Sequence, residues 1–359
     1  MRILTDYVAR EFLKMFGFLL LAFVAIYTLF DFIEKVDNFS EAGVQGSIMA
    51  VYFIYQVPAL LSLLAPLAIL MGTVICLGLM SKHGEVVAVK SAGISIFRFT
   101  LPIVLIAMGL AFASALLNES VIPNTKARTN QIWEVQVEKR PGRFYHREKF
   151  YYKGANSVYH VGFYDPETHS LSNVVYYRLD PSFNLVERVD ARRARYLSGK
   201  WTFFSGLYQK RLPEGGYTAV PFEQKVLELP ERPDDFNRLS KPSEEMSLGE
   251  LNDFVHKAEL EGYDTRRQRV DLQTKISYPF VCLIMALLGI PLALFHEGGR
   301  SLASGIVLGM AAALVYWVFF SYVRSIFGYA GVLPPFISAW LPNVVFILAS
   351  LGLLTSIRQ

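Results

Sequence analysis

The sequence predicts an α-helical membrane protein with six transmembrane helices, arranged 3+3, and an inserted all-β, jelly-roll-like domain. Two observations predict this class. Hydrophobic residues make up 53% of the 359 residues and charged residues only 18%, which is unusual for a soluble chain of this length. In addition, 25 of the 35 lysines and arginines lie between residues 126 and 275. A polar block therefore separates two apolar portions.

Six runs are apolar enough to cross a hydrocarbon core of about 30 Å, which takes roughly 20 helical residues. The second run is too long for one straight crossing and contains Pro58 and Pro66, so we expect a kink and an extension beyond the bilayer. Gly305 and Gly309 form a G-x-x-x-G in the fifth run, which permits close helix packing within the chain or against a partner. The six runs are residues 15–32, 51–80, 99–117, 276–295, 302–323 and 336–355.

The short flanks of these runs predict the orientation, because basic residues gather on the cytoplasmic side of a membrane. Two basic residues, Lys35 and Arg324, flank the runs on one side. Both termini should therefore be cytoplasmic and the polar block should lie outside. The eight basic residues on the cytoplasmic side are Arg2, Arg10, Lys14, Lys82, Lys90, Arg98, Arg300 and Arg358.

The polar block has the sequence pattern of an antiparallel sheet. Six aromatic and β-branched runs recur every 10–15 residues between turn residues, which predicts a sandwich or roll. A proline-rich charged linker, residues 229–245, follows. Ser247 and Glu250 then have capping-box spacing and open a short helix through about Leu260. The predicted domains are 1–117 (N-terminal transmembrane half), 118–245 (β-domain and linker), 246–275 (connecting helix) and 276–359 (C-terminal transmembrane half). The six runs are residues 143–152, 157–164, 172–179, 184–197, 200–212 and 216–229.

The stretch SKHGEVVAVKSAG, residues 81–93, is close to a phosphate-binding loop. It fits G-x-x-x-x-G-K-[ST] except that Val89 replaces the second glycine, and a valine there obstructs the backbone that would wrap phosphate. The chain also lacks H-E-x-x-H and G-x-S-x-G, and its net charge of +4 is too small and dispersed to indicate nucleic acid. We therefore expect no catalytic site, no metal, no cofactor and no nucleotide site of the chain's own.

Five motifs in order resemble the LptF/LptG family of lipopolysaccharide export permeases, more the LptG branch. The resemblance implies a multi-pass permease subunit of an ABC transporter in the bacterial inner membrane. That transporter extracts lipopolysaccharide and passes it to a periplasmic bridge towards the outer membrane. The implied partners are a cytoplasmic ATPase dimer that binds ATP, a second LptF-like permease, and the bridge with its membrane-anchored adaptor. The polar block would be periplasmic. The motifs are TDYVAREFLKMF, GEVVAVKSAGIS, NESVIPNTKARTN, KISYPFVCLIMALLGIPLAL and GYAGVLPPFISAWLPNVVF.

The resemblance also implies a role for residues 81–93 as a cytoplasmic coupling helix. Glu85 and Lys90 would make polar contacts with an ATPase, and Val86, Val87 and Val89 would be its apolar face. The alternative is a polar loop that follows the distribution of basic residues between spans. Without ATPase contacts, the stretch would tolerate substitution.

Basic residues near the outer membrane boundary are candidates to bind the phosphorylated sugars of such a lipid. We select Lys35, Arg128, Lys275 and Arg324, although interfacial anchoring of helix ends explains basic residues there equally well. Lys275 also begins a K-x-x-x-P pattern with Pro279, which predicts a bend that is either a moving gate or a static kink.

Two other functions fit parts of the pattern. A non-transporting scaffold for envelope assembly would need neither an ATPase contact nor a gate. An ABC permease of the lipoprotein-releasing kind would have a soluble domain too, but typically after the first span and not after the third.

Overall fold

The computed structural model describes ten stretches of the chain. The chain divides into two compact units. The first unit holds Met1–Val36, Phe53–Lys126 and Arg266–Gln359, and the second holds Asp37–Tyr52 and Ala127–Thr265. Three of these limits fall inside helices and the fourth lies directly before one, whereas the predicted domain limits follow the ends of apolar runs. The described residues are 2–138, 150–153, 157–165, 168–180, 184–197, 199–212, 216–233, 241–260, 264–294 and 302–356.

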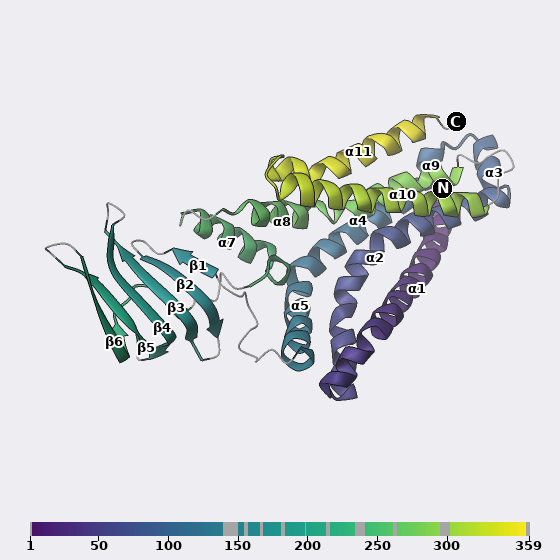
Figure 1. The fold of residues 1–359 in the computed structure, drawn as a ribbon. Helices are drawn as coiled ribbons and strands as arrows, with labels where there is room; N and C mark the ends of the chain where they lie inside the picture. Colours follow the sequence, from purple (N-terminus) through teal and green to yellow (C-terminus); the bar gives the residue numbers. More distant parts are fainter. Residues whose placement is uncertain are drawn as a thin grey trace. The chain divides into compact units, whose positions relative to one another are not determined.

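Among the residues that the structure describes, five helices are long and apolar enough to cross a membrane, and a sixth span results if one bent helix pair is counted as one (Figure 1). The pair is α8 with α9, which meet at 53°. With that pair, the number of spans equals the six that the apolar runs predict. The helices are α1 (Arg2–Ala42), α2 (Gly46–Lys82), α4 (Ile96–Ser120), α8 (Arg266–Ser277), α9 (Phe280–Leu294), α10 (Leu302–Tyr322, continued by the π-helix η3, Val323–Gly328) and α11 (Pro335–Ser356).

Helices α1 and α2 are longer than the apolar runs that predicted them. They contain 41 and 37 residues, and at about 1.5 Å per residue both exceed the ~30 Å of a hydrocarbon core. The second run is therefore longer than one straight crossing requires, as predicted, and where it lies relative to the bilayer stays a prediction. α2 continues as one helix through Pro58 and Pro66.

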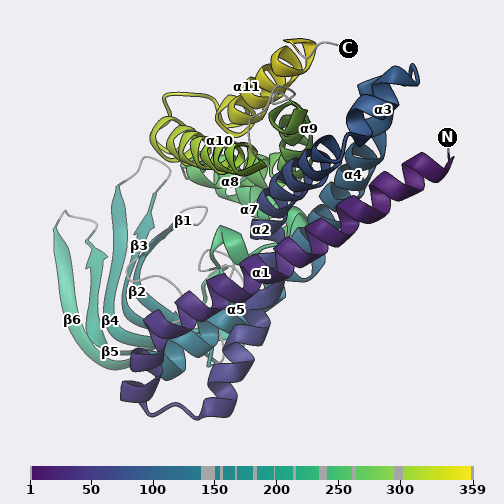
Figure 2. The same cartoon turned by 90° about the vertical axis from the view of Figure 1, so that its right-hand side faces the viewer.

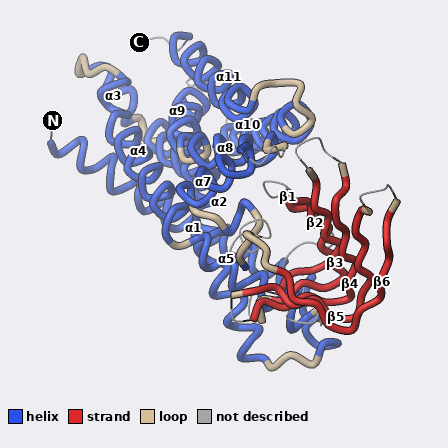
Figure 3. The backbone as a smooth tube through the Cα atoms, turned by 90° about the vertical axis from the view of Figure 1, so that its left-hand side faces the viewer, coloured by secondary structure: helices blue, strands red, loops and turns tan. Residues whose placement is uncertain are grey.

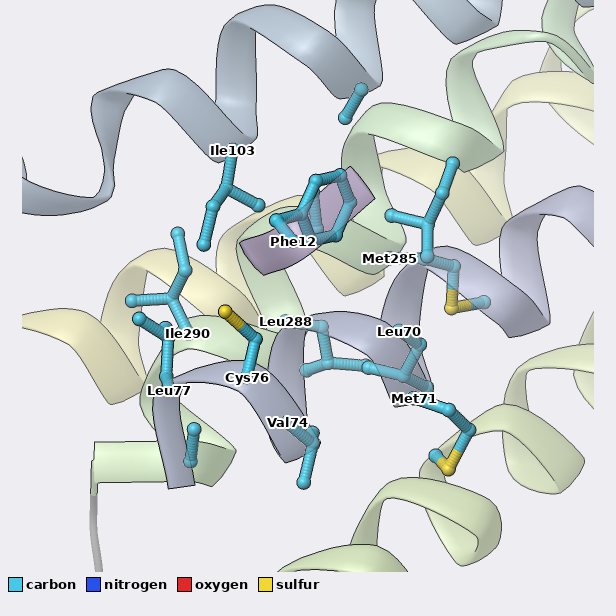
Figure 4. Packing of buried hydrophobic residues seen from close by; sticks show 14 of the residues in the cluster. Phe12, Leu70, Met71, Val74, Cys76, Leu77, Ile103, Met285, Leu288 and Ile290 are labelled. Atoms are coloured by element: carbon cyan, nitrogen blue, oxygen red, sulfur yellow. The ribbon is translucent and has the colours of Figure 1, made fainter. Parts of the chain in front are cut away.

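The core of the first unit is built around α2 and α9, because α9 is apolar on all sides and buried along nearly its whole length. Figure 4 shows side chains of this cluster from α1, α2, α4 and α9 meeting at close range. An added Cβ on Gly309 would lie 2.6 Å from Met71 Cε, and one on Gly305 would lie 3.4 Å from Val74 Cγ1. The G-x-x-x-G face thus packs within the chain, against α2. The residues labelled in Figure 4 are Phe12, Leu70, Met71, Val74, Cys76, Leu77, Ile103, Met285, Leu288 and Ile290.

The second unit contains one six-stranded antiparallel sheet in which each strand pairs with its neighbours in sequence (Figure 2). The six predicted strands are confirmed, except that residues 143–149 of the first run lie outside the described residues. Within the part of the chain that the structure describes, the strands form one up-and-down sheet, and no crossing connection of a jelly roll is present. The strands are β1 (Phe150–Lys153), β2 (Ser157–Asp165), β3 (Ser170–Leu179), β4 (Leu185–Leu197), β5 (Lys200–Arg211) and β6 (Tyr217–Leu227).

One row of residues interrupts the sheet on five strands, and we call it the crease row. At each of these positions the ladder skips one residue pair, while the register on both sides stays the same. Asn173 and Ser205 adopt positive φ angles of 50° and 52°. This left-handed conformation interrupts the extended backbone of their strands. A Cβ on Gly206, beside the row, would lie 2.1 Å from Asp190 O, so only glycine fits there. Figure 3 shows the strands bending. The crease row is Gly162, Asn173, Arg192, Ser205 and Glu223.

Five aromatic side chains of the sheet belong to a buried cluster on one face, namely Tyr159, Tyr164, Tyr176, Trp201 and Phe203. Beyond β6, the buried carboxylate of Glu231 accepts hydrogen bonds from Ser157 Oγ and Tyr159 Oη, both at 2.5 Å. Trp201 Nε1 donates to the Glu231 carbonyl oxygen at 2.8 Å. Burial and the adjacent Glu231 carboxylate raise the pKa of the Tyr159 hydroxyl, so it stays protonated and donates this bond. The chain after the last strand is thereby tied to the core of the sheet.

The predicted capping box is confirmed at the start of α7 (Leu248–Leu260). The Ser247 hydroxyl accepts from the Glu250 N–H at 3.1 Å, and the Glu250 carboxylate accepts from the Ser247 N–H at 3.1 Å. Two N–H groups that the first turn leaves unpaired are thus satisfied.

Candidate coupling and gate sites

The residues that resemble a phosphate loop form a short helix, α3 (Glu85–Ser91), between α2 and α4. Gly84 precedes it with φ 79°, a left-handed conformation that glycine adopts without strain. A phosphate loop presents its backbone N–H groups to the ligand, whereas here the Ala88 N–H donates to Gly84 O at 3.0 Å and the Ala92 N–H to Ala88 O at 3.1 Å. These N–H groups are used inside the helix, so the stretch does not present them to a ligand as a phosphate loop does.

The three valines of α3 do not share one face. Val86 is fully buried in the core of the first unit, and Val89 is half-buried against the same cluster. Val87 is 59% exposed. The prediction that all three valines are offered to a partner is therefore wrong for Val86. Residues three apart lie on one helix face, and that face of α3 packs on the bundle, which leaves Val87 on the opposite side.

Glu85 is anchored and also reaches the surface. Tyr7 Oη, from the first turns of α1, donates to Glu85 Oε1 at 3.2 Å, and His83 Nδ1 lies 4.0 Å from the same oxygen. The Glu85 side chain is 34% exposed. Glu85 is in the first turn of α3 and Lys90 in the last, where the helix dipole favours an acid and a base respectively. The arrangement holds a carboxylate in one position at the surface between α1 and α3.

At the bend between α8 and α9, Pro279 leaves nearby backbone groups without the hydrogen-bond partners of a regular helix. Pro279 has no N–H, so it cannot donate to Lys275 O as a regular helix would require. The Val281 N–H then bonds to Tyr278 O at 2.9 Å, which leaves Ser277 O without its usual donor four residues ahead. The predicted bend at K-x-x-x-P is confirmed, at 53°.

A side chain of α11 satisfies the carbonyl at this bend, and a side chain of α10 bonds to it in turn. Asn343 Nδ2, on α11, donates to Ser277 O at 2.9 Å, and Tyr316 Oη, on α10, donates to Asn343 Oδ1 at 2.7 Å. All three residues are buried. We call this set the hinge network, Ser277–Asn343–Tyr316. It links the break between α8 and α9 to two neighbouring spans through two hydrogen bonds.

A second polar cluster lies around Arg324 of η3. Arg324 Nη2 bonds to Asp271 Oδ1 on α8 at 2.8 Å, and Tyr329 Oη donates to the same oxygen at 2.6 Å. The Arg267 guanidinium carbon lies 4.8 Å from the centre of the Tyr329 ring, within range of a cation–π contact. Burial and the hydrogen bond to Asp271 raise the pKa of Tyr329 to about 12. Arg324 is therefore held by the Asp271 carboxylate of α8 and by the ring of Tyr329, directly after η3.

Replacing Asp271 with asparagine is expected to destabilise the chain, because Arg324 loses its counter-charge while its side chain is only 31% exposed. Because the asparagine Oδ1 can still accept a hydrogen bond from Arg324, the change weakens a bond between two charged groups to one with a neutral acceptor, which costs roughly 1 kcal/mol. The measurement is the unfolding midpoint of the full chain in detergent. The control is Glu228→Gln, which breaks the exposed Lys200–Glu228 pair and should leave the midpoint unchanged. Equal midpoints for the Asp271 variant and the wild type would contradict this role.

The four candidate substrate-binding residues lie in different surroundings. Lys275 is half-buried on α8 one turn after Asp271, so the structure brings it near the Arg324 cluster. Lys35 Nζ bonds to Asp31 Oδ1, four residues earlier on α1, at 2.7 Å. Arg128 is exposed on α5 (Ile122–Gln131) in the second unit and donates to Gln131 Oε1 at 3.0 Å. Their role in binding lipid stays a prediction.

Sequence reasoning missed Tyr7, Asp271, Tyr316, Tyr329 and Asn343. One signal was available for Asn343, because an amide inside an apolar helix needs a buried partner. The partners themselves are 53 to 78 residues away for Tyr7, Asp271 and Tyr329, and no sequence spacing indicates such pairs. Among the residues that the structure describes, no group of three or more His, Cys, Asp or Glu side chains could hold a metal ion.

Comparison with known proteins agrees with this architecture. The family model described as "Lipopolysaccharide export system permease LptF/LptG" matches residues 6–356. The lipopolysaccharide export system permease protein LptG of Escherichia coli K12 is 24% identical over 374 residues, covering 94% of this chain and 95% of that protein. The LptG protein of Haemophilus influenzae is 23% identical over 373 residues, covering 99% of each chain. With apolar spans, a β-sheet insertion and a family match along nearly its whole length, this chain belongs to the lipopolysaccharide export permease family LptF/LptG.

Proposed function

We propose that this permease is the LptG-type half of an ABC transporter that extracts lipopolysaccharide from the bacterial inner membrane. In this proposal both termini and α3 face the cytoplasm and the β-sheet unit lies in the periplasm. A homologous LptF-like permease pairs with the chain, and a cytoplasmic ATPase dimer supplies the energy. The lipid then passes to a periplasmic bridge and its membrane-anchored adaptor, towards the outer membrane.

The observation that carries the proposal is the surface carboxylate of Glu85 on α3. A seven-residue helix between two spans is too short to fold alone, and it is held here by Val86 in the core and by Tyr7 on α1. A rigid helix that presents Glu85 and Val87 can transmit movement from a partner to α2 and α4. Because the backbone N–H groups of the phosphate-loop pattern are bonded within the helix, the partner would bind the nucleotide.

The bend between α8 and α9 supports a role in moving the substrate. The Ser277 carbonyl at the bend is bonded by Asn343 of α11, which Tyr316 of α10 bonds in turn, so the bend angle depends on how those two helices lie. Arg324, Asp271 and Lys275 flank the same segment. Movement of α10 or α11 would therefore change α8 and the charges that it carries, which is what a gate for a phosphorylated lipid requires.

The experiment that tests the proposal is purification of the tagged full chain in a mild detergent, followed by mass spectrometry of proteins and lipids. We expect a cytoplasmic ATPase, a second six-span permease and a phosphorylated glycolipid. If the membrane partners are retained and no ATPase accompanies them, a non-transporting scaffold explains the chain better. If a lipoprotein co-purifies with the chain in place of the glycolipid, the lipoprotein-releasing alternative gains support.

A further inference from the structure

A pocket of about 420 Å³ opens on the β-sheet where the crease row crosses β3, β4 and β5. Three arginines and two serines contribute to its lining, namely Arg192, Arg193, Arg195, Ser172 and Ser205, and Leu197 and Phe204 supply apolar surface. All of these residues belong to the second unit. The pocket is therefore defined independently of the membrane-spanning helices.

The crease row explains why the arginines gather on one face. In a regular strand, alternate residues point to opposite faces, so Arg192 and Arg193 would be separated. In β4, however, Ala191 and Ala194 are both buried and the two arginines between them are both exposed. The crease shifts the alternation by one residue, and the same shift occurs in β3 between Leu171 and Val174. Arg193 lies directly between Ser172 and Phe204 on the neighbouring strands.

The charge of this cluster is not balanced by the residues that line the pocket. None of the lining residues is acidic. Within the described stretches, Arg192 and Arg193 take part in no ion pair, and Asp190 pairs with Arg188 at 3.2 Å. Arg195 Nε donates to the Thr168 carbonyl oxygen at 3.4 Å. Glu223, in the crease row, is on β6 and separated from Arg192 by β5.

We propose that this pocket binds the phosphate-bearing headgroup of the exported glycolipid, an inference that rests on the proposed function for the identity of the ligand. A guanidinium group binds phosphate oxygens through two parallel hydrogen bonds, and the hydroxyls of Ser172 and Ser205 add donors. A single exposed arginine is weakly attracted to an anion in water with salt, so a ligand with several negative oxygens is needed to engage three. Phe204 and Leu197 offer contact to a sugar ring, which inorganic phosphate could not use.

The test measures binding to the full chain in phosphatidylcholine nanodiscs without any ATPase. Three probes are compared: a doubly phosphorylated, acylated glucosamine disaccharide, its dephosphorylated form, and inorganic pyrophosphate. The pocket variant is Arg192→Gln with Arg193→Gln. The matched control is Lys210→Gln with Arg211→Gln, which removes the same charge from exposed positions at the end of β5. Tryptophan fluorescence confirms that both variants are folded.

We expect the pocket variant to bind the phosphorylated disaccharide about tenfold more weakly, while the control changes its affinity by less than about threefold. The dephosphorylated probe should bind both variants alike. Equal weakening by the two variants would overturn the proposal, because it would indicate general attraction to a basic surface. Tight pyrophosphate binding that the pocket variant loses, without disaccharide binding, would overturn the lipid headgroup as occupant. Since the assay contains no ATPase, neither of these failures bears on the coupling role of α3. That role is tested separately by the Glu85 variants.

Discussion

Replacing Glu85 with arginine is expected to abolish recovery of the ATPase with this permease and to stop lipopolysaccharide export. The Glu85 carboxylate is held at the surface by Tyr7, and a partner that binds there would desolvate it. Breaking a desolvated charge pair costs about 2–5 kcal/mol, and reversing the charge adds repulsion. The affinity for the ATPase should therefore fall by about 30-fold or more. Co-purification and lipid release from reconstituted vesicles measure the two effects.

Two controls separate coupling from folding at this position. Tyr7→Phe removes the hydroxyl that donates to Glu85 at 3.2 Å and keeps the carboxylate, so the ATPase should still be recovered. Glu85→Gln keeps the shape of the side chain and removes its charge, and it should weaken recovery less than arginine does. Normal export in the Glu85→Arg variant would show that α3 is only a connecting segment. Equal loss in the Tyr7→Phe variant would assign Glu85 a structural role.

The spans and the strands could be predicted from the sequence because their signals are local. An apolar run of about 20 residues crosses a membrane whatever its neighbours are, and alternation between turn residues predicts each strand. The capping box at Ser247 and Glu250 is equally local, because both partners lie within one helical turn. The buried side of α3 was not predictable in this way. Val86 and Val87 have the same side chain and differ only in which one faces the bundle. That depends on the direction in which α3 continues after Gly84.

The crease row was missed because it is a property of the whole sheet. No single strand indicates that Asn173, Arg192 and Ser205 will stand opposite one another. Gly162 and Gly206 were a signal, since glycine within a strand indicates a close approach of backbones. In the same way, Arg324 was selected as a ligand for lipid from its place at the end of a span. Its pairing with Asp271, 53 residues earlier, depends on the fold.

Replacing Asn343 with leucine is expected to destabilise the packing of α11 against α8 and α10 strongly. The new side chain has a similar volume, so packing is kept, but Ser277 O and Tyr316 Oη both lose their partner in a buried site. Each unpaired polar group costs about 1–3 kcal/mol in protein interiors. Hydrogen bonds between membrane helices average only about 0.6 kcal/mol, because separated helices find other partners. Within the folded chain, Ser277 O cannot turn to its regular helical donor, since the Val281 N–H is already bonded to Tyr278 O.

The unfolding midpoint of the full chain in detergent measures this loss, and Tyr316→Phe is the matched control. That variant removes the bond to Asn343 Oδ1 and leaves the bond from Asn343 Nδ2 to Ser277 O intact, so it should cost less than half as much. If the Asn343→Leu variant is as stable as the wild type, Pro279 alone maintains the bend and the kink is static. Suppose instead that the Asn343→Leu variant is less stable than the wild type and releases less lipid than the Tyr316→Phe variant. The bend then depends on its contacts with α11. Only a bend of that second kind can be opened and closed by movement of a neighbouring helix.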